Sequence, residues 1–234
     1  MRIKLLILIL LGLNLKLSAQ NLRLGFGFVN QMSSSSRIIQ LDSVMVFEDD
    51  QQGSFDLMPF LSFEWPITER LYSNLGVQFY KSAVFLETRY TSDSYPKHIP
   101  FITKGWTTPV YNVELPFGLS YSIFRKKNIR INVDFMAVPV WSIQNFTPLS
   151  IDVPQGIDWT QEILDVLNAV ETIPSSFYMN YQYGLSVGFN RIGVTLFRAN
   201  NMNRSISNGY TLYGTTYSFE RRIRSTRIGL YYSF

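Results

Sequence analysis

The single histidine of the chain, His98, is the side chain best suited by type to acid–base chemistry. Ser92, Asp93 and Ser94 lie just before it, and Ser, His and Asp side chains can act together as nucleophile, base and orienting acid. Such a set works only with the right spatial geometry, and these residue types are common in polar loops. We therefore expect a solvated loop here and a non-enzymatic protein, with catalysis as the alternative.

A second group of residues could bind a divalent cation through oxygen atoms. Glu48, Asp49 and Asp50 are consecutive and Asp56 follows, but their spacing does not match a calcium-binding loop. The chain has no cysteine and one histidine, which argues against zinc sites built on either residue. We expect a solvated acidic loop, no metal and no other cofactor.

Six more charged residues stand at alternate positions of segments that are otherwise rich in apolar residues. They are Arg23, Glu64, Glu114, Arg130, Asp134 and Arg227. The spacing predicts that they share the less apolar faces of β-strands. Unpaired charges would be costly if these faces were shielded from water, so we expect a network of salt bridges. A polar path for small solutes is the alternative.

The elements that must position these charges are strands with one apolar and one polar face. Eight segments alternate in this way, most clearly from Tyr111 to Tyr121. The predicted strands are residues 21–29, 56–65, 70–84, 111–121, 129–137, 177–189, 192–198 and 223–234. Pro59, Pro116 and Pro139 interrupt the pattern, and proline cannot donate a ladder hydrogen bond, so we expect bulges or rim positions there.

The connections between these segments alternate between long and short. The long connections are residues 30–54, 91–107, 142–176 and 200–222, and the short ones are 66–69, 125–128 and 190–191. A short strand within residues 38–47 and an extension of the last hairpin by residues 210–219 are expected. Asp158 and Gln161 form a capping pattern before an apolar stripe, which predicts one short helix in the 142–176 loop. We favour a helix packed on the rim over a partner-docking helix.

The first 19 residues have the pattern of a secretory signal peptide. Arg2 and Lys4 precede an apolar core of about nine residues, too short for the roughly 20 residues of a spanning helix. Leu17-Ser18-Ala19 is a suitable cleavage site, which leaves residues 20–234 as one domain. Without residues 1–19 the chain has 18 basic and 17 acidic residues, so no nucleic-acid partner is expected.

The rest of the chain has no apolar run long enough for a helical span, yet the whole sequence contains 18 Phe and 14 Tyr. Alternating segments with many aromatic residues are typical of a membrane barrel. A soluble periplasmic β-barrel or sandwich would turn the same apolar faces inward, and the pattern alone does not separate the two. The alternation of loop lengths favours the membrane barrel.

The chain ends on Ile228-Gly229-Leu230-Tyr231-Tyr232-Ser233-Phe234, an alternating strand with a terminal aromatic residue. With the signal peptide and the alternating strands, this end resembles the small eight-stranded outer-membrane β-barrels of Gram-negative bacteria, the OmpA/OmpX-type, porin-like kind. The resemblance implies an all-β, transmembrane, up-and-down antiparallel barrel of about eight strands in the cell outer membrane. It also implies that the barrel-insertion machinery reads Ile228, Leu230, Tyr232 and Phe234 as an assembly signal.

The resemblance does not select one activity, because barrels of this shape serve as surface proteins, adhesins, narrow pores, lipid-editing enzymes or secretion accessories. We expect a non-enzymatic barrel with a side-chain-filled lumen, whose long extracellular loops contact a surface or secretion-system partner. The alternatives are a narrow porin-like channel, a lipid A-modifying enzyme that uses His98, and a soluble periplasmic ligand-binding β-barrel. Outer-membrane lipid and lipopolysaccharide are expected partners, the latter through the basic run of Arg221, Arg222, Arg224 and Arg227.

Overall fold

The computed structural model describes residues 21–41, 44–48, 54–90, 103–144, 165–166, 169, 176–203, 205–207, 209–218 and 220–234. The predicted signal peptide lies outside the described residues. Of the predicted helix, only Asp165, Val166 and Ala169 are described, with helical backbone, so the helix as a whole stays a prediction. In this part of the chain no helix is long and apolar enough to span a membrane.

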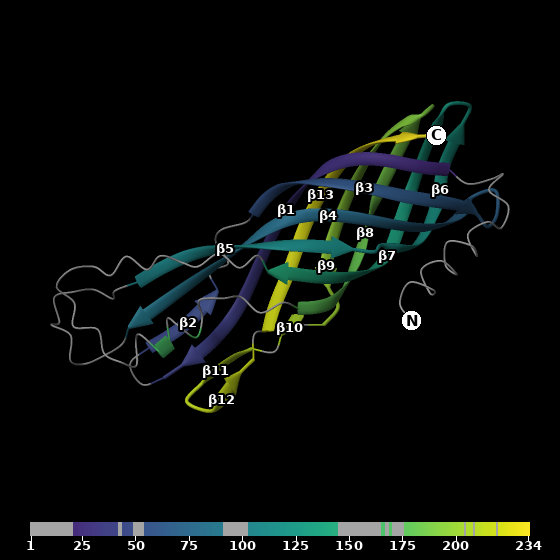
Figure 1. Ribbon diagram of the computed structural model, residues 1–234. Helices are drawn as coiled ribbons and strands as arrows, with labels where there is room; N and C mark the ends of the chain where they lie inside the picture. Colours follow the sequence, from purple (N-terminus) through teal and green to yellow (C-terminus); the bar gives the residue numbers. More distant parts are fainter. Residues whose placement is uncertain are drawn as a thin grey trace, which may run out of the picture.

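The described strands form a closed antiparallel barrel with eight strand positions (Figure 1). Five positions are single strands: β1 (Asn21–Gln40), β4 (Leu71–Tyr90), β7 (Ile129–Gln144), β8 (Ser176–Phe189) and β13 (Glu220–Ser233). The other three each contain two segments: β2 (Val44–Glu48) with β3 (Ser54–Pro66), β5 (Thr103–Glu114) with β6 (Phe117–Lys126), and β9 (Ile192–Asn201) with β10 (Ser205–Ser207). Pairing of β1 with β13 closes the barrel.

The two ends of the barrel differ in the length of their connections. One end carries the short turns after β3, β6 and β8 together with the end of β13; we call it the short-turn end. At the other end, the long-loop end, the strands continue past the barrel, and β11 (Tyr210–Leu212) and β12 (Thr215–Tyr217) form a separate hairpin (Figure 1). This hairpin lies within the predicted hairpin extension.

Strands on the long-loop side are longer than the alternation predicts. The prediction of a loop from residue 30 to 54 is wrong, because β1 continues to Gln40 and pairs with both β13 and β2. The run of serines from Ser33 lies within this strand. Alternation predicts a strand only where one face contacts lipid or core, whereas ladder hydrogen bonds continue beyond that limit.

The three prolines lie where a ladder is interrupted. Pro116 falls in the gap between β5 and β6, and Pro139 lies opposite this gap, where its carbonyl accepts a bond from the Leu115 amide at 3.1 Å. Pro59 lies one residue beyond the last ladder pair of β3 with β4, which is Phe60 with Gln78. Since β4 next pairs with β2 at Leu86, its residues 79–85 have no ladder partner on that side among the described residues.

Candidate functional site in the barrel lumen

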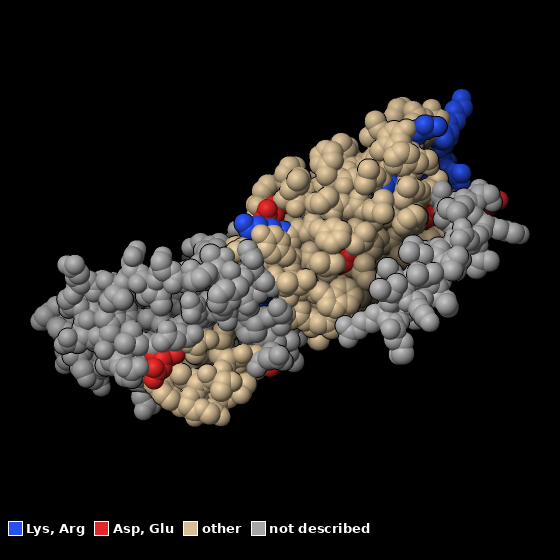
Figure 2. All heavy atoms as spheres, in the orientation of Figure 1, with Lys and Arg blue, Asp and Glu red and all other residues tan. Residues whose placement is uncertain are grey.

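The outer face of the barrel is apolar and the inner face is polar. Phe26, Phe135 and Phe189 are 52%, 61% and 59% exposed, although large apolar side chains are normally buried. Figure 2 shows few charges in the band between the two ends, while Lys and Arg gather at the short-turn end. A closed barrel with an apolar outside and a polar inside is a transmembrane barrel. The fold is that of a small outer-membrane β-barrel. The alternative of a soluble periplasmic barrel is therefore wrong.

The lower network of the lumen lies near the short-turn end and joins three strands. Arg23 from β1 and Arg130 from β7 both bind the Oε2 atom of Glu64 from β3, and the Glu64 side chain is 1% exposed. The guanidinium carbons lie 4.7 Å from the ring centre of Tyr231 and 4.4 Å from that of Tyr72, respectively. Salt bridges and cation–π contacts thus hold both arginines in place.

Asp134 follows Arg130 on the inner face of β7 but binds hydroxyl groups. The Ser120 hydroxyl donates to Asp134 Oδ1, and the Asn74 amide donates to the Ser120 hydroxyl. Within the described ranges no cation lies within ion-pair distance of Asp134. The expectation that all six charges form salt bridges is therefore wrong for this residue, because strand stagger places hydroxyl groups rather than a guanidinium beside it.

The central network is built on Glu114 from β5 and Arg227 from β13. Their two hydrogen bonds measure 2.6 and 2.9 Å, and both side chains are at most 1% exposed. The Tyr80 hydroxyl donates to Glu114 at 3.0 Å. Further partners are Gln78, which donates to Glu114, and Gln182 and Ser225, which accept from Arg227. Every guanidinium nitrogen of Arg227 has an acceptor, as a buried arginine requires.

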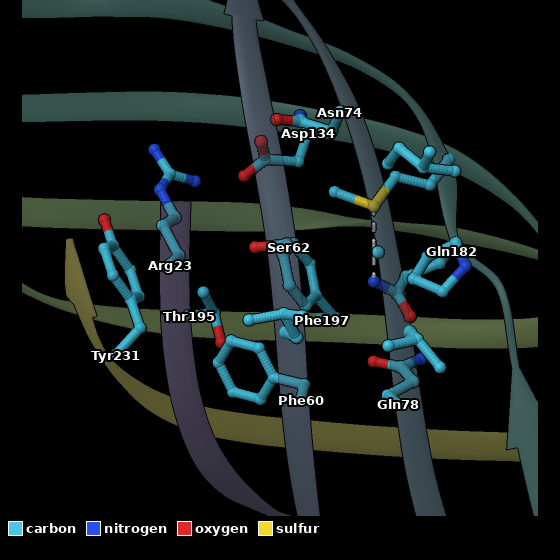
Figure 3. Close-up of a pocket in the computed structure, with 16 residues that line it drawn as sticks. Arg23, Phe60, Ser62, Asn74, Gln78, Asp134, Gln182, Thr195, Phe197 and Tyr231 are labelled. Atoms are coloured by element: carbon cyan, nitrogen blue, oxygen red, sulfur yellow. Dashed lines mark hydrogen bonds between the residues drawn. The ribbon is translucent and has the colours of Figure 1, made fainter. Parts of the chain in front are cut away.

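A small cavity of about 50 Å³ lies between the two networks (Figure 3). Phe60, Met136 and Phe197 line it together with polar groups such as Gln182, whose amide nitrogen lies 3.7 Å from the Met136 sulfur. A cavity of this size holds a few water molecules at most. The middle of the lumen is therefore almost filled by side chains, as eight strands require.

Above the central network, toward the long-loop end, the lumen holds buried apolar clusters beside buried polar side chains such as Asn112, whose amide donates to the Ser82 hydroxyl at 2.8 Å. Val138, Val140, Tyr178 and Ile223 form one buried cluster. A second cluster joins Val29, Met58 and Tyr80.

The basic run at the start of β13 is divided by the alternation of the strand. Arg221 and Arg227 point inward and are 2% and 1% exposed, and Arg221 donates to the Ser33 hydroxyl at 2.9 Å. Only Arg222 and Arg224 are exposed, so the expectation that four arginines meet lipopolysaccharide together is wrong for the other two. Arg198 from the neighbouring strand β9 is also exposed and lies on the same outer face as Arg222 and Arg224. The alternation of side chains along both strands could have predicted this group of three arginines.

Most of the candidate catalytic and cation-binding residues of the loops cannot be placed. His98, Ser92, Asp93, Asp49 and Asp50 lie outside the described residues. Among the residues with described positions, no three His, Cys, Asp or Glu side chains form a group that could hold a metal ion.

The predicted assembly signal lies on the lipid-facing side of β13. Ile228, Leu230, Tyr232 and Phe234 are all exposed, and Arg191 donates to the Tyr232 hydroxyl at 3.1 Å. Its recognition by the insertion machinery stays a prediction.

Sequence reasoning that considered only charges missed the uncharged partners of both networks. They are the inward residues Gln31, Tyr72, Asn74, Gln78, Tyr80, Gln182 and Tyr231. The alternation that places the charges inside also places these residues there.

No protein-family model matches this chain, and no curated protein matches it. Similar solved structures include the attachment invasion locus protein Ail of Yersinia pestis, at 8% identity and a TM-score of 0.42, covering 92% of this chain and 99% of Ail. The outer-membrane protease OmpT of Escherichia coli is 10% identical with a TM-score of 0.39, covering 93% and 97% of the two chains. LpxR from Salmonella typhimurium is 7% identical with a TM-score of 0.26, covering 88% and 99%.

Proposed function

We propose that this protein is a non-enzymatic barrel with a closed lumen, whose contacts with other molecules are made at its long-loop end. The observation that carries the proposal is the central network, in which Glu114 and Arg227 bind each other across the lumen and are both buried. A solute on the barrel axis would have to separate this pair. Separating buried opposite charges is costly, which opposes the alternative of a porin-like channel.

Single-channel recording in planar bilayers tests the closed lumen. We expect the purified wild-type barrel to give no conductance steps, because the central network and the apolar cluster both block the axis. A triple variant that truncates side chains of both the central network and the apolar cluster should conduct: Glu114→Ala with Arg227→Ala and Tyr178→Ala. Gel mobility before and after heating checks that both proteins are folded. Steady conductance of the wild-type protein would overturn the proposal.

The proposed orientation places the long-loop end outside the cell and the short-turn end in the periplasm, after cleavage of residues 1–19. Because the chain has no cysteine, single cysteines can test it. Thr215→Cys, on the exposed part of the β11–β12 hairpin, should react with a membrane-impermeant maleimide on intact cells. The matched control Asn128→Cys, in the short turn after β6, should react only after the outer membrane is permeabilised. The reverse pattern would contradict the orientation.

The exposed arginines of β9 and β13 support a contact with lipopolysaccharide in this orientation. Arg198, Arg222 and Arg224 lie on the outer face, toward the long-loop end from the apolar residues Leu196 and Ile228. Arginine binds phosphate groups through its planar fork of donors. We expect Arg222→Gln with Arg224→Gln to reduce the lipopolysaccharide that co-purifies with the barrel.

The 142–176 loop is the proposed docking surface for a surface or secretion-system partner. Its described part contacts the hairpin, since the Tyr213 hydroxyl donates to Asp165 at 2.8 Å, and Val166 is fully buried. These contacts favour a segment packed on the rim, so a partner would meet the loop and the hairpin as one surface. Pull-down with the barrel that lacks the β11–β12 hairpin, compared with the whole barrel, would test this surface.

A further inference from the structure

A polar cavity of about 230 Å³ lies at the short-turn end, below the lower network. Four cationic residues line it: Arg23, Arg125, Lys127 and Arg130. None of its described lining residues is acidic, and the remaining polar ones include Asn128 and Asn190 of the short turns. We call this cavity the basic vestibule. Because exposed turn residues form part of its wall, it communicates with the solvent at this end.

The cations of the basic vestibule outnumber the carboxylates that face them. Arg23 and Arg130 share the single carboxylate of Glu64, and Asp134, deeper in the lumen, interacts electrostatically with Arg23. Among the described residues, Arg125 binds only uncharged oxygens, the Tyr72 hydroxyl at 3.1 Å and the Glu69 carbonyl at 3.4 Å. Four cations against two carboxylates leave a net positive charge in a recess, which attracts anions.

Arg23 also keeps hydrogen-bonding capacity that none of the described residues uses. It is 8% exposed, and its buried Nε atom has no acceptor among them. Glu64 and the tyrosine rings of the lower network hold both guanidinium groups in place. Preorganised forks of N–H donors are the usual binding groups for phosphate oxygens. A cavity smaller than a typical drug-sized pocket suits a single phosphate group rather than a large ligand.

We propose that the basic vestibule is a phosphate-binding site that opens toward the periplasm. Arg125 and Lys127 attract the anion at the mouth, and Arg23 and Arg130 bind it at the base. The phosphate comes from a soluble molecule or from the headgroup of a phospholipid in the adjacent leaflet, which present the same chemistry. This site lies at the opposite end from the proposed surface contacts and does not depend on them.

Isothermal titration calorimetry with inorganic phosphate tests the site on the folded barrel in zwitterionic detergent, at constant ionic strength. The vestibule variant combines Arg125→Gln with Lys127→Asn; asparagine tolerates the positive φ of 44° at position 127. The control variant combines Arg70→Gln with Lys81→Gln, which removes the same charge from two exposed residues that do not line the vestibule. We expect saturable one-site binding by the wild-type barrel, a loss of affinity of at least tenfold in the vestibule variant, and a change below twofold in the control.

A second arm identifies the source of the phosphate. The titration is repeated in nanodiscs of phosphatidylcholine with and without phosphatidylglycerol. If a lipid headgroup occupies the vestibule, phosphatidylglycerol competes with phosphate and weakens phosphate binding by the wild-type barrel. The weaker phosphate binding that remains in the vestibule variant should not change with the lipid. If the ligand is soluble, the lipid has no effect and wild-type binding persists. No saturable binding in any medium, or an equal loss of affinity in both double variants, would overturn the proposal.

Discussion

The central and lower networks use the same residue types but satisfy them to different degrees. In the central network, both carboxylate oxygens of Glu114 bind Arg227, and each guanidinium nitrogen of Arg227 has an acceptor. In the lower network, two arginines share one oxygen of Glu64, while the Oε1 atom of Glu64 and the Nε atom of Arg23 have no hydrogen-bond partner among the described residues. The fully paired charges of the central network close the lumen, whereas the incompletely paired charges of the lower network keep hydrogen-bonding groups that a ligand can use.

Removing Arg227 should have the largest effect, because it leaves Glu114 buried without a counter-charge. We expect Arg227→Ala to lower the free energy of unfolding by about 3–5 kcal/mol, measured by urea titration of the barrel in lipid vesicles. The paired replacement Glu114→Leu with Arg227→Met should restore most of this loss, since an apolar pair needs no counter-charge. A loss below about 1 kcal/mol in the single variant would show that the central pair is not a closed network.

Removing Arg23 should have a smaller effect, because Glu64 keeps its contact with Arg130. We expect Arg23→Ala to lower the free energy of unfolding by about 1–2 kcal/mol in the same urea titration. A loss as large as that of Arg227→Ala would erase the distinction between the two networks. The reciprocal variant Arg130→Ala serves as the matched control, since it leaves Glu64 with Arg23.

Removing the aromatic support of the lower network should have the smallest effect. Tyr231→Leu keeps an apolar side chain, although a smaller one, and removes the ring beneath Arg23, so we expect a loss of about 0.5–1 kcal/mol. Tyr72→Leu should behave similarly unless its hydroxyl contact with Arg125 adds to the effect. No change in either variant would show that the salt bridges to Glu64 alone position the two arginines.

Alternation predicts the strands and which residues share a face, and the alternation of loop lengths indicates that the apolar face is the outer one. Glu64, Glu114 and Arg227 could be assigned to the inner face because each follows the period of two within an apolar segment. The same rule, applied to the basic run of β13, separates Arg221 from Arg222. The length of β1 could not be predicted in this way, because the Ser33–Ser36 run carries no alternation and is held by its ladder with neighbouring strands.

The partners within the lumen could not be predicted from one sequence, because they depend on the stagger of eight strands. Asp134 resembles Glu64 in sequence context, yet one binds Ser120 and the other binds two arginines. The register of each strand pair, and therefore the depth of each side chain, is set by closure of the whole barrel. The basic vestibule could not be predicted for the same reason, since Arg125 at the end of β6 and Lys127 in the following turn meet Arg23 only in space.

Among the described residues, the ladder between β3 and β4 ends at Phe60 and Gln78. The ladder between β7 and β8, by contrast, runs without a break from Ile129 to Ser142. No described residue pairs with residues 79–85 of β4 on the β3 side, and exposed Lys81 indicates that water reaches this level of the wall. The barrel should therefore open locally at this place first. In hydrogen–deuterium exchange, the amides of residues 79–85 of β4 should exchange while those between β7 and β8 stay protected.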